Sequence, residues 1–170
     1  MTLQPDPLPS HRLLAGLWML TVAALALHNA EEWWLRLTEW IADHRWMPGG
    51  ALHGDQAQYG LALIIVTVAV LAIATVAVVT RAAWSSEVLV CVSYALIINA
   101  ASHLVLSLAT WDLMPGTISG ILLLVPLGLF VIHTLPPVPW SVWSAVTIAL
   151  AAIGIVLGSL LLAAAFTALV

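Results

Sequence analysis

The sequence has few charged residues, no lysine and a single cysteine. Charged side chains make up 7% of the 170 residues, and the four basic residues are all arginines. No basic cluster is therefore available to bind nucleic acid or to recognise anionic lipid headgroups. Cys91 has no partner for an intramolecular disulfide. Because it lies in an apolar run, it is predicted to be a small packing residue.

Hydrophobic residues, by contrast, make up 63% of the chain, and the mean hydropathy is +1.11. Soluble domains are about half apolar and about a quarter charged, so this composition excludes that class. The long apolar runs predict an all-α fold, a polytopic transmembrane helical bundle that forms a single domain over residues 13–170. About five spanning helices are expected, over residues 13–37, 56–79, 86–109, 117–135 and 141–170.

The segments outside these five runs have simpler predictions. Residues 1–12 are rich in proline and polar side chains and predict a disordered tail. Residues 38–46 contain two tryptophans among charged side chains and predict a short interfacial helix. Pro126 and Gly128 should kink the fourth spanning helix.

A polar cluster ends the first apolar run. His28, Glu31 and Glu32 stand at positions i, i+3 and i+4, so one face of a helix presents an imidazole and one or two carboxylates. These groups suit zinc, iron or manganese, or a general acid–base pair. A helix end that enters the headgroup region also tolerates such residues without forming any site.

A second polar cluster lies within the third apolar run. Asn99 and His103 are four residues apart and share a helix face. An asparagine at this depth needs a hydrogen-bond partner, and interhelical hydrogen bonding alone would account for the pair. The first and third helices cross the bilayer in the same direction. His28 and His103 each lie fifteen residues after the start of their apolar run, about 22 Å into a core of about 30 Å. The two clusters should therefore meet at one level.

Three further residues lie on the same side as the clusters. His53 and Asp55 precede the second spanning helix, and Tyr59 stands one turn inside it. His53 and Asp55 are predicted to fold over the site as a lid or to supply a further ligand. Tyr59 is predicted to donate a hydrogen bond to a ligand from the outer shell, or to be an interfacial aromatic residue.

The pattern His28-x-x-Glu31-Glu32, followed by Asn99-x-x-x-His103, resembles the HXXEE family of bacterial integral membrane proteins. Pro115-Gly116 before the fourth apolar run is similar as well, and the resemblance covers roughly residues 15–135. It implies a multi-pass protein of the bacterial inner membrane whose function is uncharacterised. It also implies that the two motifs form an active site, and it implies no substrate.

The leading hypothesis is a metal-dependent intramembrane hydrolase. His28, Glu32 and His103 would ligate zinc, iron or manganese and leave a position open for water. Glu31 would be the general base or a further ligand, and Asn99 would orient a ligand or bind an oxyanion. The bilayer is the expected partner, and a lipid-like molecule is the expected substrate.

Three alternatives remain open at this point. Buried carboxylates and histidines also bind protons and ions in transporters. A transport path through so few helices would require a homo-oligomer. Facing histidines at positions 28 and 103 could hold a haem, although two carboxylates beside the iron argue against it. Finally, the polar residues could serve the structure alone.

Overall fold

In the part of the chain that the structure describes, every element of regular secondary structure is a helix. The computed structural model describes residues 9–44, 46, 50–138 and 141–169. Five helical segments in these ranges are long and apolar enough to cross a membrane. The prediction of an all-α bundle with five spanning helices is therefore confirmed. The predicted disordered tail falls largely on residues 1–8, which lie outside the described residues.

The five spanning segments follow the predicted ranges closely. They are α1 (His11–Trp34), α4 (Gln56–Val79), α5 (Ser85–Thr110), a composite fourth segment and α8 (Val142–Thr167). The Ser10 hydroxyl accepts a hydrogen bond from the Leu13 amide and caps α1. Because of this N-cap, the helix begins two residues earlier than the apolar run alone suggests.

The fourth segment consists of α6 (Thr117–Ser119), a π-helical turn η1 (Gly120–Leu124) and α7 (Val125–Thr134). Within η1, the Val125 amide donates to the Gly120 carbonyl, five residues back. Pro126 directly follows this amide and has no N–H of its own. The predicted irregularity therefore takes the form of a π turn just before the proline.

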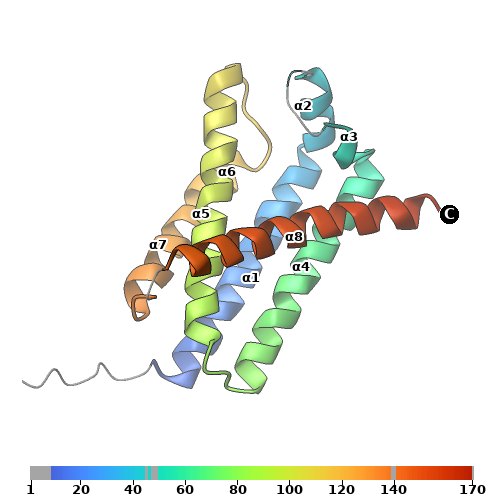
Figure 1. Ribbon diagram of the computed structural model, residues 1–170. Coiled ribbons are helices and arrows are strands. Elements are labelled where there is room, and N and C mark those ends of the chain that lie inside the picture. Colours follow the sequence, from blue (N-terminus) through green and yellow to red (C-terminus); the bar gives the residue numbers. More distant parts are fainter. Residues whose placement is uncertain (1–8, 45, 47–49, 139–140, 170) are drawn as a thin grey trace, which may run out of the picture.

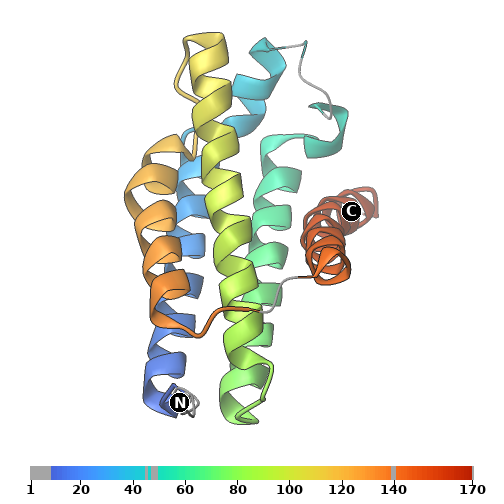
Figure 2. The same cartoon turned by 60° about the vertical axis from the view of Figure 1, so that its left-hand side comes forward.

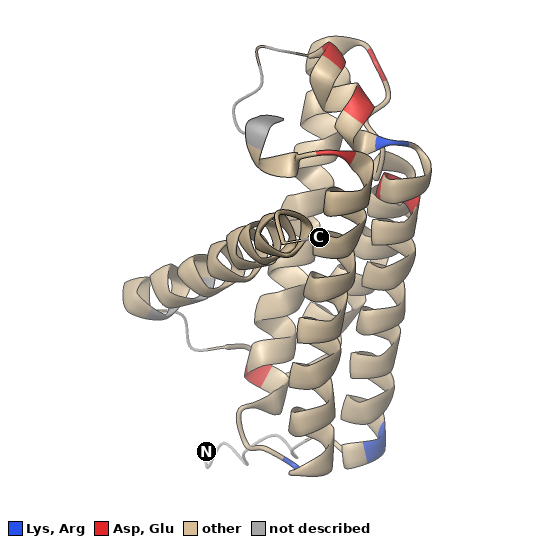
Figure 3. Ribbon diagram, turned by 90° about the vertical axis from the view of Figure 1, so that its right-hand side faces the viewer, with Lys and Arg blue, Asp and Glu red and all other residues tan. Residues whose placement is uncertain are grey.

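Two short helices connect α1 to α4 at one end of the bundle. They are α2 (Leu37–Asp43) and α3 (Gly50–His53). The predicted interfacial helix corresponds to α2, which starts one residue earlier and ends at Asp43. Charged residues lie towards the two ends of the bundle and leave its middle almost free of them (Figure 3).

Four of the spanning segments run alongside one another, and α8 crosses them obliquely (Figure 1). Seen from a second direction, α8 lies outside the four and next to α4 (Figure 2), with which it makes its main contacts.

A close helix contact joins the fourth segment to α5. A Cβ atom at Gly120 would lie 3.1 Å from the Ala100 Cβ, and one at Gly128 would lie 2.8 Å from the Ile97 side chain. Small residues let helix backbones approach in this way. The contact brings the start of the fourth segment against the part of α5 that carries Asn99 and His103.

Candidate metal centre

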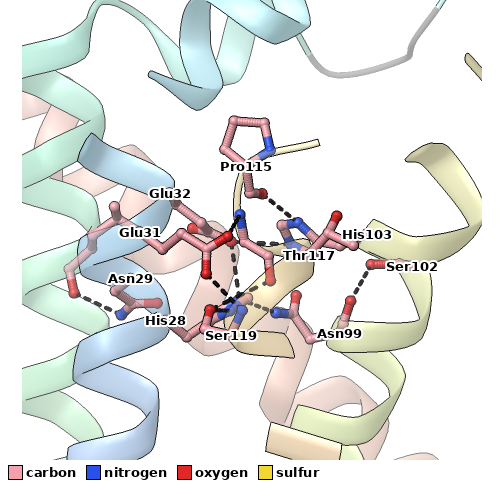
Figure 4. Close-up of polar contacts among 12 residues, drawn as sticks. His28, Asn29, Glu31, Glu32, Asn99, Ser102, His103, Pro115, Thr117 and Ser119 are labelled. Carbon is pink, nitrogen blue, oxygen red and sulfur yellow. Dashed lines mark hydrogen bonds and ion pairs between the residues drawn. The ribbon is translucent and has the colours of Figure 1, made fainter. Parts of the chain in front are cut away.

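Two histidines and one carboxylate converge between α1 and α5. Glu32 Oε1 lies 3.1 Å from His28 Nε2 and 3.0 Å from His103 Nε2 (Figure 4). The three residues are only 1%, 5% and 4% exposed for His28, Glu32 and His103, respectively. Their ligand-type atoms all lie within 4.8 Å of one another. The expected meeting of the two clusters at one depth is therefore what the structure has.

The hydrogen bonds of His103 determine where the ring carries its proton. Its Nδ1 lies 2.7 Å from the Pro115 carbonyl oxygen, which can only accept a hydrogen bond. Nδ1 is therefore protonated, and in a neutral ring Nε2 has a lone pair directed at the Glu32 carboxylate. Two acceptors at 3.0 Å repel each other. The contact is attractive when one further proton lies between the ring and the carboxylate, on either partner, or when a metal ion lies between the ligands.

His28 has a matching contact on its outer side. Its Nδ1 lies 3.0 Å from the Ser119 hydroxyl, which in turn faces the Gly116 carbonyl. When Ser119 donates to that carbonyl, its oxygen accepts from His28 Nδ1–H, and the lone pair on Nε2 faces the Asn99 amide group and Glu32. Histidine ligands of metals are typically fixed in this way by a partner on the other ring nitrogen.

The spacing of the three atoms suits a small divalent metal. A tetrahedral metal with bonds of about 2.0–2.1 Å separates its ligand atoms by about 3.3 Å. The observed separations from Glu32 Oε1 are within a few tenths of an ångström of that value. The buried His–Glu–His group could therefore hold a metal ion.

Tyr59 is hydrogen-bonded to the second carboxylate oxygen of Glu32. Its hydroxyl donates to Glu32 Oε2 at 2.6 Å, from the first turns of α4. Tyr59 therefore contacts one of the predicted ligands, and its outer-shell role stays a prediction. A ligand carboxylate held by a second hydrogen bond keeps its orientation.

Asn99 lies beside His28 on the α5 side. Its amide nitrogen is 2.8 Å from His28 Nε2, and its side chain is half-buried. Asn99 is thus in contact with a candidate ligand, as expected. Its role in binding an oxyanion stays a prediction.

Glu31 contacts a different part of the protein from Glu32, the backbone at the start of the fourth segment. Its Oε1 accepts from the amides of Gly116 and Ile118 at 3.1 and 3.2 Å, and its Oε2 accepts from the Ser119 amide at 2.7 Å. Glu31 does not belong to the group of converging ligand atoms. The general-base or ligand role that the sequence suggested for Glu31 stays a prediction that these contacts do not favour.

Neither His53 nor Asp55 is brought to the ligand atoms. The Asp55 carboxylate accepts from the Gln58 amide at 2.8 Å and caps α4. The His53 ring lies beside the Tyr59 ring, with centroids 5.4 Å apart. The predicted lid or ligand role has no support from these contacts, because a cap and a ring contact account for where the two side chains lie.

The close contact of both histidine rings also bears on the haem alternative. The ring centroids are 5.1 Å apart in a T-shaped arrangement, and both Nε2 atoms approach the same carboxylate oxygen. A porphyrin has no room between rings placed in this way. The arrangement does not suit axial ligation of a haem by His28 and His103.

Ser119 and the Pro115 carbonyl were not among the residues predicted for the site. A usable signal was present for Ser119, which follows the start of the fourth apolar run. That run is antiparallel to α1, so its first turn enters the bundle at the level of His28. The carbonyl of Pro115 had no signal, because only the path of the preceding loop aims it at His103.

Fold and site together define an all-helical protein with helices long and apolar enough to cross a membrane and a buried His–Glu–His cluster at one end. The sequence model described as "Protein of unknown function with HXXEE motif" matches residues 18–131. The match covers most of the chain, and the protein belongs to the HXXEE family. No curated protein and no solved structure matches the chain.

Proposed function

We propose that the protein is a metal-dependent intramembrane enzyme, most simply a hydrolase that acts on a lipid-like substrate. The observation that carries this proposal is the convergence of His28 Nε2, His103 Nε2 and Glu32 Oε1 with one proton position already fixed on His103. Catalytic zinc sites typically have three protein ligands of these types and an open position. Zinc, iron and manganese all suit this donor set.

His28, Glu32 and His103 would hold a divalent metal, which would supply an activated water molecule or polarise a carbonyl or phosphoryl oxygen. The protein's own residues would hold the ligands in place and orient the substrate. Tyr59 holds the outer oxygen of Glu32, and Ser119 and the Pro115 carbonyl hold the outer nitrogens of the histidines. Asn99, half-buried next to His28, is the group placed to donate a hydrogen bond to a substrate oxygen.

An apolar groove beside the site supports a lipid-like substrate. Its volume is about 440 Å³, and it is lined by Leu27, Ala30, Glu31, Trp34, Leu35 and Ile118. Glu31 lines this groove and also binds the turn that packs over the two histidines. An acyl chain in the groove would contact Glu31, whose neighbour Glu32 is buried with the two histidines. The site of action would be the cell membrane, and for a family of bacterial proteins the inner membrane.

The test is an activity screen on purified protein reconstituted in vesicles of mixed bacterial lipids. Products are followed by mass spectrometry after loading with zinc, iron or manganese. The proposal predicts that a lipid is cleaved by the parent protein and not by His28→Ala. His133→Ala is the matched control, since His133 is exposed near the end of α7 and bonds the Leu129 carbonyl. Equal product from His28→Ala and parent would contradict the proposal.

One observation favours a second candidate, a proton-binding module. The Glu32–His103 contact at 3.0 Å is already suited to a shared extra proton without any metal. Carboxylate–histidine pairs of this kind serve as proton sites in membrane transporters. This candidate predicts proton flux across vesicles that Glu32→Gln abolishes and that chelators leave unchanged.

A further inference from the structure

We infer that Glu31 is a positioning residue, which holds the turn at residues 115–119 against the two histidines so that their Nε2 atoms face Glu32. The inference rests on the proposed metal site for its functional meaning. It gives the two adjacent glutamates different tasks, because Glu32 contacts the histidines directly and Glu31 acts on them through the turn.

The first observation is that Glu31 is hydrogen-bonded to the turn. Three backbone amides, those of Gly116, Ile118 and Ser119, donate to its carboxylate. They belong to the N-terminal turn of the fourth segment, where unpaired amides and the helix dipole favour a negative charge. A carboxylate that accepts several such bonds fixes the turn relative to α1.

The second observation is that the same turn contacts both histidine rings. Its Pro115 carbonyl accepts from His103 Nδ1, and its Ser119 hydroxyl contacts His28 Nδ1. Each ring therefore has one nitrogen against the turn and the other nitrogen against Glu32. A displacement of the turn would release both rings together.

The third observation is the close fit of the turn over the rings. Gly116 has φ +94°, and a Cβ at this position would lie 2.8 Å from the His103 ring and 2.9 Å from the His28 ring. Only glycine adopts this backbone conformation readily and leaves that space free. The turn is thus shaped to the rings, and Glu31 is the side chain from α1 that fastens it there.

Glutamine at position 31 would keep the shape of the side chain and lose this function. Its amide offers one acceptor oxygen and an NH2 group that would face a backbone N–H. Three donors cannot all be satisfied by one oxygen in the same arrangement. The turn should therefore loosen in Glu31→Gln, while the chemistry of the ligands is unchanged.

The experiment compares the parent protein with Glu31→Gln, Glu32→Gln and Glu87→Gln in detergent. Glu87 is exposed in the first turn of α5 and provides the matched control for a carboxylate-to-amide change. The first readout is the side-chain ¹H–¹⁵N spectrum of metal-free protein, in which the His103 Nδ1 proton should be protected by the Pro115 carbonyl. The Trp18 indole N–H, bonded to Ser85 in the other half of the bundle, is the internal control. The second readout is zinc affinity.

The inference predicts that Glu31→Gln loses the protected His103 Nδ1 signal and keeps the Trp18 signal. Zinc affinity should fall by about 10- to 100-fold, the usual effect of outer-shell changes. Glu32→Gln should lose zinc binding, and Glu87→Gln should match the parent. Retention of the His103 signal in Glu31→Gln would overturn the inference, whatever happens to zinc affinity. If the parent binds no zinc, the proposed function fails while the Nδ1 signal still decides the role of Glu31.

Discussion

The two halves of the bundle differ in what fills the space between the helices. The half with the start of α1 and the start of α5 is filled by apolar side chains, among them Leu17, Trp18 and Leu89. Trp18 is fully buried, and its indole N–H donates to the Ser85 hydroxyl at 2.9 Å. In the other half, His28, Glu32 and His103 occupy the equivalent interior positions.

The polar half contains buried ionisable groups that the association of the helices does not require. Between membrane helices, packing and small residues suffice for association, as in the apolar half. Ionisable groups inside a membrane are costly and mark functional sites by default. Within the described part of the chain, the only buried side-chain polar atom without a hydrogen-bond partner is Trp40 Nε1, which lies outside the cluster. The polar half is therefore a hydrogen-bonded arrangement whose Glu32–His103 contact needs a further proton or a metal ion.

The largest effect is expected from Glu32→Gln, which breaks the polar half at its centre. The substitution removes the charge that contacts both histidines and alters the acceptor of the Tyr59 hydroxyl. Breaking a buried ion pair costs about 3–5 kcal/mol, and the metal should be lost as well. Denaturation in mixed micelles and metal analysis measure the two effects. A variant as stable as the parent with its metal retained would show that Glu32 is not central.

Gly116→Ala should have the next largest effect. The residue has φ +94°, and the added methyl group would meet the His103 ring at 2.8 Å. The strain should lower the free energy of unfolding by about 1–3 kcal/mol and weaken metal binding. Gly154→Ala is the matched control, since nothing lies within 4 Å of that site. In a helix interior this control should be neutral or stabilising by up to about 1 kcal/mol. Equal effects of the two substitutions would argue against the close fit of the turn.

Tyr59→Phe tests the outer support of the carboxylate. It removes one hydrogen bond to Glu32 Oε2 and leaves the ring in place. A bond to a charged group contributes about 1.5 kcal/mol, and metal affinity should fall by about tenfold. In the Glu32→Gln background, Tyr59→Phe should lower the free energy of unfolding by less than it does in the parent. Equal effects in both backgrounds would mean that the two residues do not act together.

The smallest effect is expected from Ser85→Ala in the apolar half. The Trp18 N–H would lose its acceptor, and hydrogen bonds between membrane helices contribute about 0.6 kcal/mol on average. Metal content should stay at the level of the parent. Loss of metal in Ser85→Ala would show that the two halves are coupled, contrary to the comparison drawn above.

The sequence predicted the helical architecture because each spanning helix is a long apolar run. It also predicted that His28 and His103 would meet, since helices that cross in one direction preserve depth. The same depth argument placed Tyr59 on the side of the two clusters. Periodicity and length are local properties, and in a membrane they determine most of the fold.

The separate paths of Glu31 and Glu32 could not be read from their spacing. Adjacent residues on a helix point about 100° apart, but the partner that each one meets depends on how the fourth segment packs. The turn over the histidines arises from the loop after α5, whose Met114 amide and Thr117 hydroxyl both bond to Ser107. Such contacts join residues without any periodic pattern. For the same reason, the sequence placed Asp55 near the site although it serves as a helix cap.

The most direct test of the central claim is the metal content of the purified protein. The parent, prepared in mild detergent without chelators, should be compared with the His28→Ala/His103→Ala double variant by elemental analysis. The proposed centre predicts about one equivalent of zinc, iron or manganese in the parent and none in the variant. Absence of metal from both samples would contradict the account and leave the Glu32–His103 pair as a proton site.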